Sequence, residues 1–137
     1  MKLHPVIING DKVPHYYVDS NGNPWSSKRG DGNAYMLSPG INSRGYYTVN
    51  ICHNGKKKSH QLHRLVAETL IPFPKPEGVT HSDWKTTPDS VKRLLVSQYM
   101  VNHIDHDKEN YHPDNLEWVT SKGNAVARET HYRNVNG

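Results

Sequence analysis

The chain has 137 residues, the size of one domain or of two small lobes that share a core. Only 34% of its residues are hydrophobic, and 17 Lys and Arg against 13 Asp and Glu give a formal net charge of +4. This mildly basic balance suits a polyanionic partner but does not identify one, because many soluble proteins share it.

The only cysteine is Cys52, which excludes an intrachain disulfide and a zinc site built from several thiolates. No apolar run approaches the length of a membrane span, and residues 1–5 lack the apolar stretch of a signal peptide. We therefore expect a soluble protein that stays in the cytoplasm of the cell that makes it and has no membrane partner.

Short antiparallel strands are predicted from Tyr16 to Gln61, because glycine-containing turns interrupt every apolar run before it could form a helix. The clearest strand is predicted over residues 46–52. There Tyr47, Val49 and Ile51 alternate with the other side chains, so one face of the strand is expected to be buried and the other free.

The dipeptide Asn54-Gly55 follows this strand and accepts the positive φ angles of a type I′ turn. A return strand is therefore expected through Lys56 to Gln61. Its first three residues, Lys56, Lys57 and Lys58, make the hairpin basic. They are interpreted either as a solvated sheet edge protected by lysines or as a contact for DNA phosphates.

An amphipathic helix packed on the sheet is predicted next, since apolar residues recur at helical spacing until Pro72 and Pro74 end the pattern. These apolar residues are Leu62, Leu65, Val66 and Leu70.

The stretch from Pro72 to Thr87 is predicted to be a loop or linker, because it is rich in proline and poor in apolar side chains. A second helix is predicted after it, with Thr87 as its cap and Pro88 at its first position. Trp84, within this region, is interpreted as a core residue or as a DNA contact.

The last part of the chain places His103 at the end of a short strand and Asn115 before a second strand, Leu116 to Val119. Thr120 or Ser121 then caps a predicted helix that carries Asn124 in its opening turn. A strand, loop, strand and helix of this length can bring distant polar side chains to one wall of a cleft.

His103 is the candidate general base of this cleft. Its ordinary pKa of about 6.5 leaves the imidazole mostly neutral at pH 7, so it can accept a proton from water. Asn102 and Asn124 carry amide oxygens, which are hard donors of the kind that Mg²⁺ or Mn²⁺ accepts beside water and phosphate oxygens. Together they can supply the activated water and the charge stabilisation that phosphodiester hydrolysis requires.

Two alternatives for the metal stay open. Asp105 and Asp107 could contribute a carboxylate, directly or through water, although a role for Asp105 in ordering the loop is favoured. A zinc site from His103, His106 and His112 is conceivable from the ligand type alone.

The segments Val101-Asn102-His103-Ile104-Asp105 and Asp114 to Thr120, with Asn124, closely resemble the His-Asn-His (HNH) homing-endonuclease family. Residues 62–70 are similar to the helix that usually precedes this unit. Tyr16-Tyr17-Val18 and Gly45 to Val49 are similar to the N-terminal module that commonly accompanies it. Residues 78–98 depart from the family, in which the helix and the Val-Asn-His strand are joined by a short connection.

The resemblance implies a metal-dependent endonuclease that acts on double-stranded DNA and leaves 5′-phosphate and 3′-hydroxyl ends. It implies that Asn102 and Asn124 hold a single Mg²⁺ or Mn²⁺ ion, that His103 is catalytic, and that Asn115 braces the catalytic loop. The position of Asn102 is often aspartate in HNH enzymes, so a neutral residue implies weaker metal binding. Arg64 is expected to contact a DNA phosphate or to brace the loop.

The expected fold class is α+β: an N-terminal antiparallel β lobe, then helices, then a C-terminal ββα-metal unit. The expected domains are a DNA-binding module at 1–72, a linker with an inserted helix at 73–98, and the nuclease unit at 99–137. The alternatives are a DNA-binding regulator without catalysis and a general phage nuclease for packaging or host-DNA degradation. A monomer would nick, and a double-strand cut would need two sites, as in a homodimer. No small-molecule cofactor is expected.

Overall fold

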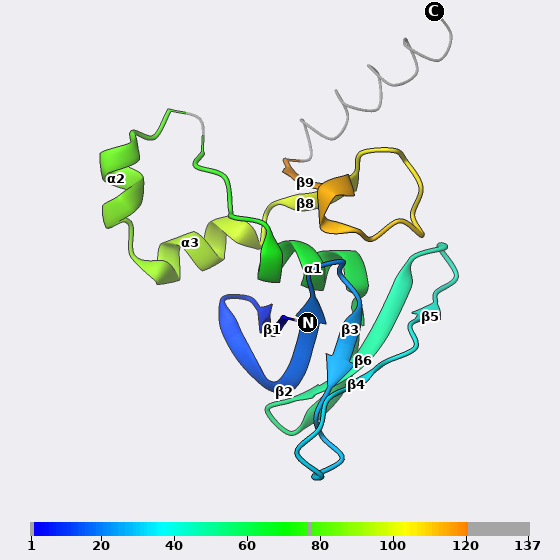
Figure 1. Ribbon diagram of the computed structural model, residues 1–137. Helices are drawn as coiled ribbons and strands as arrows, with labels where there is room; N and C mark the ends of the chain where they lie inside the picture. The colour runs from blue at the N-terminus through cyan, green and yellow to red at the C-terminus, as the bar shows by residue number, and fades with distance from the viewer. Residues whose placement is uncertain (1, 77, 121–137) are drawn as a thin grey trace, which may run out of the picture.

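The computed structural model describes residues 2–76 and 78–120, which form three antiparallel sheets and three α-helices (Figure 1). In strand order, the first sheet is β1 (Leu3–Ile8), β2 (Asp11–Asp19), β3 (Pro24–Ser26) and β4 (Tyr35–Met36), and the second is β5 (Gly40–Ile41), β6 (Tyr47–His53) and β7 (Lys56–Gln61). The third pairs β8 (Met100–His103) with β9 (Leu116–Val119), and the helices are α1 (Leu62–Leu70), α2 (His81–Thr86) and α3 (Asp89–Val96). The expected mixed fold with antiparallel sheets is confirmed for these residues. The expected helix of the ββα unit lies outside them.

The β6–β7 hairpin forms as its sequence predicts. Asn54 and Gly55 both have positive φ, at 54° and 74°, and they join His53 to its cross-strand partner Lys56. Val49 and Ile51 are buried on one face of β6, whereas Asn50 between them is exposed. Alternation and turn chemistry therefore fix both the register and the buried face of this hairpin.

Helix α1 is the centre of the molecule, with the two N-terminal sheets on one side and the β8–β9 hairpin on the other (Figure 1). Its apolar positions recur at helical spacing, so they form one stripe that both sheets can cover. The buried apolar core combines the first sheet (Val6, Val13, Tyr16, Val18), the second sheet (Val49, Ile51), the helix (Leu62, Leu65, Val66) and β9 (Leu116). The β8–β9 hairpin is thus anchored to the N-terminal lobe through α1.

The prediction of a loop up to Thr87 was wrong, because residues 81–86 form α2. Thr80 caps this helix by accepting a hydrogen bond from the backbone N–H of Asp83 at 3.0 Å. Thr87 ends α2 instead of starting the next helix, and Pro88 is the residue before α3 instead of its first helical residue. The Thr-x-x-Asp pattern is the local signal that stabilises this short helix.

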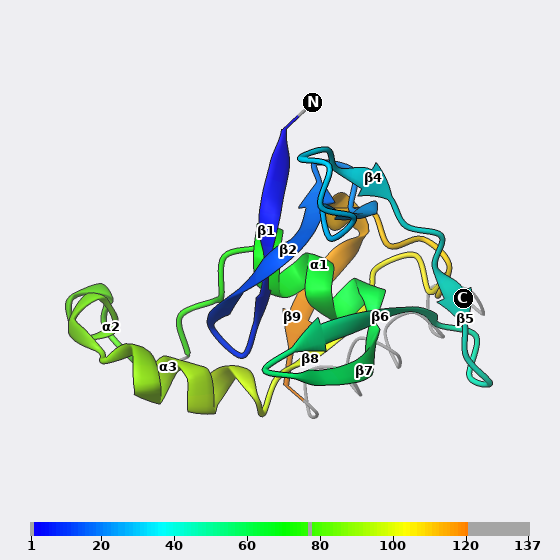
Figure 2. The same ribbon diagram turned by 90° about the horizontal axis from the view of Figure 1, so that it is seen from below.

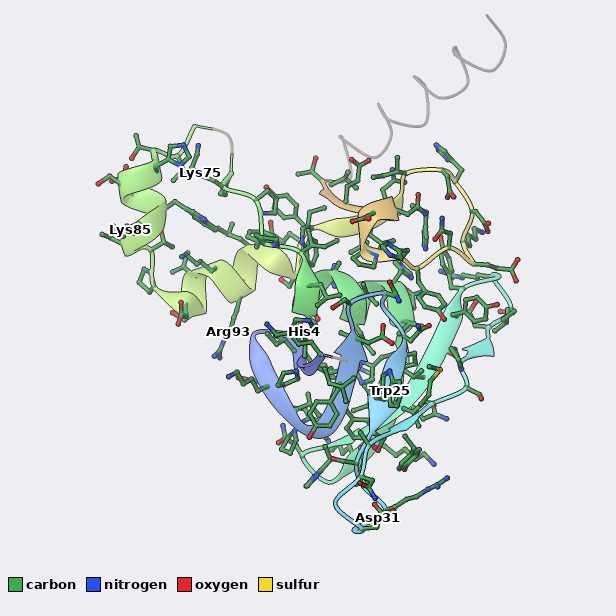
Figure 3. The ribbon with its side chains drawn as sticks, in the orientation of Figure 1. His4, Trp25, Asp31, Lys75, Lys85 and Arg93 are labelled. Atoms are coloured by element: carbon green, nitrogen blue, oxygen red, sulfur yellow. The ribbon has the colours of Figure 1, made fainter. Side chains whose placement is uncertain are left out.

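The two helices α2 and α3 form an arm that extends beside the body (Figures 1 and 2). Trp84 is half-buried between Phe73, at 5.8 Å between ring centroids, and the Lys92 ammonium, at 4.8 Å from its ring. Because the Phe73 ring also contacts Trp118 in β9, these contacts join the arm to the body. The Arg93 side chain reaches toward the first sheet (Figure 3), where it pairs with Asp11 at 3.3 Å. No helix within residues 2–76 and 78–120 has the length and apolar character needed to cross a membrane.

Candidate active site

The β8–β9 hairpin places the central residues of the site. Asn102 lies opposite Glu117 and His103 lies opposite Leu116. Leu116 is buried against α1 and the sheets, which fixes this hairpin on the core. The Asn102 amide donates to the Glu117 carboxylate at 2.9 Å, so the carbonyl oxygen is the polar atom of Asn102 that remains for a ligand.

A hydrogen-bond network closes the loop between the two strands. Asn115 donates to the Asp105 carboxylate and to the backbone carbonyl of Asn110, both at 2.9 Å, and its own carbonyl accepts the Asp105 N–H at 3.0 Å. Asn110 donates to the other Asp105 oxygen at 2.9 Å. The hydrogen bonds that its carboxylate accepts, from the Asn110 side chain first and then from the Asp107 N–H and the Asn115 side chain, hold the pKa of Asp105 below its ordinary value. Asp105 and Asn115 thus order the loop.

His103 lies in an aromatic stack that the sequence did not predict. Its ring centroid is 4.6 Å from that of His63 on α1 and 5.7 Å from that of Tyr46, which precedes β6. Tyr46 and His63 also stack on each other at 4.9 Å. The Lys108 ammonium lies 4.9 Å from the Tyr46 ring. The stack joins three separate segments of the chain, and the rings of Tyr46 and His63 hold the plane of the candidate base.

Burial keeps both histidines neutral. His103 is 5% exposed and His63 is 7% exposed. Burial lowers the pKa of His103 and outweighs the Asp105 and Asp107 carboxylates, which act to raise it. Burial, with smaller contributions from His103 and Arg64, lowers the pKa of His63 to about 4.

The Nε2 atom of His103 is buried and has no hydrogen-bond partner among the described residues. A buried polar nitrogen without a partner costs about 1–3 kcal/mol. Such a cost calls for an explanation, and orphaned polar groups of this kind often belong to functional sites.

The zinc alternative is not supported. Residues 2–76 and 78–120 contain no cluster of three or more His, Cys, Asp or Glu side chains positioned to hold a metal ion. His112 instead caps the short 3₁₀ helix Pro113–Asn115 by accepting the Asp114 N–H at 3.1 Å. Among the described residues, the metal ligand expected from the sequence is the amide oxygen of Asn102, a hard donor that fits an ion retaining several waters. Asn124 lies outside the described residues.

Arg64 has the contacts of a bracing residue. Its guanidinium donates to the backbone carbonyl of Tyr99, lies 3.7 Å from the Glu68 carboxylate and stacks 4.9 Å from the Trp118 ring. It thereby ties α1 to the entrance of β8 and to β9. Its contact with DNA stays a prediction.

The three lysines of β7 do not share one face. Lys58 lies opposite the buried Ile51 and Lys56 lies opposite His53, whereas Lys57 lies opposite Cys52 on the other face. All three are exposed. Any single phosphate backbone lying along one face of the strand would therefore meet Lys56 and Lys58 together or Lys57 alone.

Comparison with known proteins finds similarity to HNH endonucleases. Residues 95–126 match the family model described as HNH endonuclease. The chain is 32% identical, over 82% of its length, to an uncharacterized HNH endonuclease of Acanthamoeba polyphaga mimivirus, of which it covers 26%. It is 32% identical, over 81% of its length, to the DNA endonuclease I-HmuI of Bacillus phage SP01, of which it covers 49%.

The fold is also similar to a solved structure of the HNH homing endonuclease I-HmuI, described for its DNA binding and cleavage. The TM-score is 0.65 with 27% sequence identity, and the match covers 96% of this chain and 59% of that one. The chain thus spans between a quarter and a half of the length of these curated relatives.

Proposed function

Because this chain is homologous to the HNH endonucleases in sequence and in fold, we propose that it is a metal-dependent endonuclease of the homing type. Its proposed substrate is double-stranded DNA, and its products carry 5′-phosphate and 3′-hydroxyl ends. The observation that carries the proposal is His103, a buried neutral imidazole that packs against the rings of Tyr46 and His63 and directly follows Asn102 in β8.

His103 acts as the general base. Nε2 is buried, so we assign proton acceptance to Nδ1, which takes a proton from the attacking water. The water oxygen forms a bond to phosphorus while the bond from phosphorus to the 3′ oxygen breaks, and the departing oxygen takes a proton from solvent water. Tyr46 and His63 keep the imidazole plane fixed during this step, and Asn115 holds the loop that begins immediately after His103.

We assign Asn102 and Asn124 to a single Mg²⁺ or Mn²⁺ ion, bound through their amide oxygens. When bound, such an ion supplies positive charge for the phosphoryl oxygens and the leaving 3′ oxygen. Neutral ligands attract the ion less than a carboxylate does, so the site is expected to need a higher concentration of free metal. Glu117 orients the Asn102 amide by its hydrogen bond.

DNA binding is proposed to involve Lys56, Lys57 and Lys58 on the exposed strand β7, with Arg64 as a further phosphate contact. The support is a row of cations on an exposed edge strand in a chain with a nuclease-like unit. A monomer with one such site nicks one strand, whereas a double-strand cut needs two chains. This activity is proposed for the cytoplasm, where the DNA is accessible.

The test is a nicking assay with the purified chain, supercoiled plasmid and Mg²⁺, resolved on a gel. We expect nicked or linear product from the parent and at least about a 10²-fold slower reaction from His103→Ala, since a positioned general base contributes this much. Duplex binding by His103→Ala should stay close to that of the parent. Activity of this variant above about a tenth of the parent would contradict the assignment of the base. Binding without cleavage by the parent would favour the regulator, and cleavage without target preference would favour the general nuclease.

A further inference from the structure

A hollow of about 260 Å³ lies directly beside the His103 stack. Tyr46 and His63 form part of its wall, and both rings also pack on His103. Arg44 and Arg64 lie on the same wall. The hollow therefore adjoins two of the rings that pack on the proposed catalytic group, and it is lined by aromatic rings and cationic side chains.

The turn that carries Arg44 is held in one conformation. The Asn42 side-chain oxygen accepts the backbone N–H of Arg44 at 3.0 Å and that of Tyr46 at 3.1 Å. Gly45, with a φ of 86°, donates its N–H to the Asn42 carbonyl at 3.0 Å. The turn is therefore pre-organised, and ordering it costs little when a ligand binds.

Lys108 joins this turn to the catalytic loop. Its ammonium donates to the Arg44 backbone carbonyl at 3.0 Å, in addition to lying over the Tyr46 ring. The turn between β5 and β6 and the loop between β8 and β9 consequently lie side by side (Figure 1). The turn that carries Arg44 is thus placed relative to His103 through Lys108 and Tyr46, and not only through the distant core.

The two arginines of the hollow differ in what occupies their side chains. The Arg64 guanidinium is engaged by Tyr99, Glu68 and Trp118. The exposed Arg44 guanidinium has no hydrogen bond or ion pair with residues 2–76 or 78–120. An arginine with its donors in water can form two parallel hydrogen bonds to a phosphate without breaking a protein contact.

We propose that Arg44 binds a backbone phosphate of the DNA strand next to the scissile phosphate, with the hollow as the subsite for the flanking nucleotide. The position follows from the proposed function, because His103 locates the scissile phosphate and the hollow adjoins the same stack. The Lys108 ammonium adds a second positive charge on this side of the stack. The ligand is a phosphate and not a base edge, since a guanidinium on an exposed turn meets the outside of a duplex first.

The test measures binding of a fluorescent duplex oligonucleotide over a range of salt concentrations, in a His103→Ala background that prevents cleavage. Arg44→Gln should weaken binding and flatten the slope of log affinity against log salt by about 0.9, the effect of one lost phosphate contact. Arg44→Lys keeps the charge and should recover most of the slope. The matched control is Arg29→Gln, an exposed arginine over Tyr35 in the loop after β3, at the other end of the sheets from the site (Figure 1).

A second arm uses the chain with His103 intact and plasmid cleavage. Arg44→Gln should lower kcat/KM by about tenfold, and Arg29→Gln should leave it unchanged. The proposed phosphate contact would be overturned if Arg44→Gln had the same salt slope of binding as the parent. It would also be overturned if Arg29→Gln lost as much affinity as Arg44→Gln. A loss of affinity for particular DNA sequences only, with an unchanged salt slope, would also overturn the proposal, because it would show that Arg44 contacts a base. If the parent binds DNA with the expected slopes but never cleaves, the proposed function fails while the phosphate contact stands.

Discussion

His63 makes the stability of this protein depend on pH. Its folded-state pKa of about 4 lies below the ordinary value of 6.5, because burial between Tyr46 and His103 disfavours the charged ring. A histidine with a lowered pKa binds its proton more readily in the unfolded chain. Its contribution to stability is therefore complete above pH 6.5 and is lost as the pH falls from 6.5 towards 4.

The size of the effect follows from the two pKa values. A pKa that falls from 6.5 to about 4 corresponds to a total of about 3 kcal/mol, of which about 2 kcal/mol is already lost at pH 5. Such a loss is a large fraction of the stability of a small domain. The lowered pKa values of His60 and His103 act in the same direction, whereas the raised pKa of Glu68 opposes them.

Urea unfolding at pH 7 and at pH 5 measures this loss, and His63→Phe isolates it. Phenylalanine keeps a ring in the stack but cannot be protonated. We expect the free energy of unfolding of the parent to fall by about 2 kcal/mol more than that of His63→Phe between the two pH values. His81→Gln is the matched control, because this histidine is exposed on α2. Equal pH dependence in the parent and in His63→Phe would refute the reasoning.

Three further predictions concern activity and DNA binding. Because the pKa of His103 is lowered, the base stays neutral further into the acidic range. The acid limb of kcat against pH should therefore have its midpoint below 6.5. A midpoint above 7 would show that another group is the base. Asn102→Asp should reduce the Mg²⁺ concentration needed for half-maximal cleavage, because a carboxylate binds the ion more strongly, and an increased requirement would remove Asn102 from the metal site. Replacing Lys56, Lys57 and Lys58 by Gln should flatten the salt slope of duplex binding by about 0.9 to 1.8, because one phosphate backbone meets at most two of them. The variant should leave kcat at saturating DNA nearly unchanged. An unchanged slope and affinity would make these residues a solvated sheet edge.

The sequence alone was sufficient to predict the elements whose physical cause is local. The alternation in β6, the Asn54-Gly55 turn and the apolar spacing of α1 each act over a few residues, and the structure confirms all three. The strand and loop pattern around His103 and Asn115 was likewise readable, because each residue is placed by its own strand or turn.

Only the tertiary structure decided what surrounds these elements. The stack of Tyr46 and His63 on His103 joins three segments far apart in the chain, and no local pattern records such a contact. The engagement of Arg64 has the same origin, since two of its partners, Tyr99 just before β8 and Trp118 in β9, reach it only after α1 is packed. Local propensity selects turns and helices through nearby backbone energetics, whereas burial and its effect on pKa depend on the packing of the whole fold.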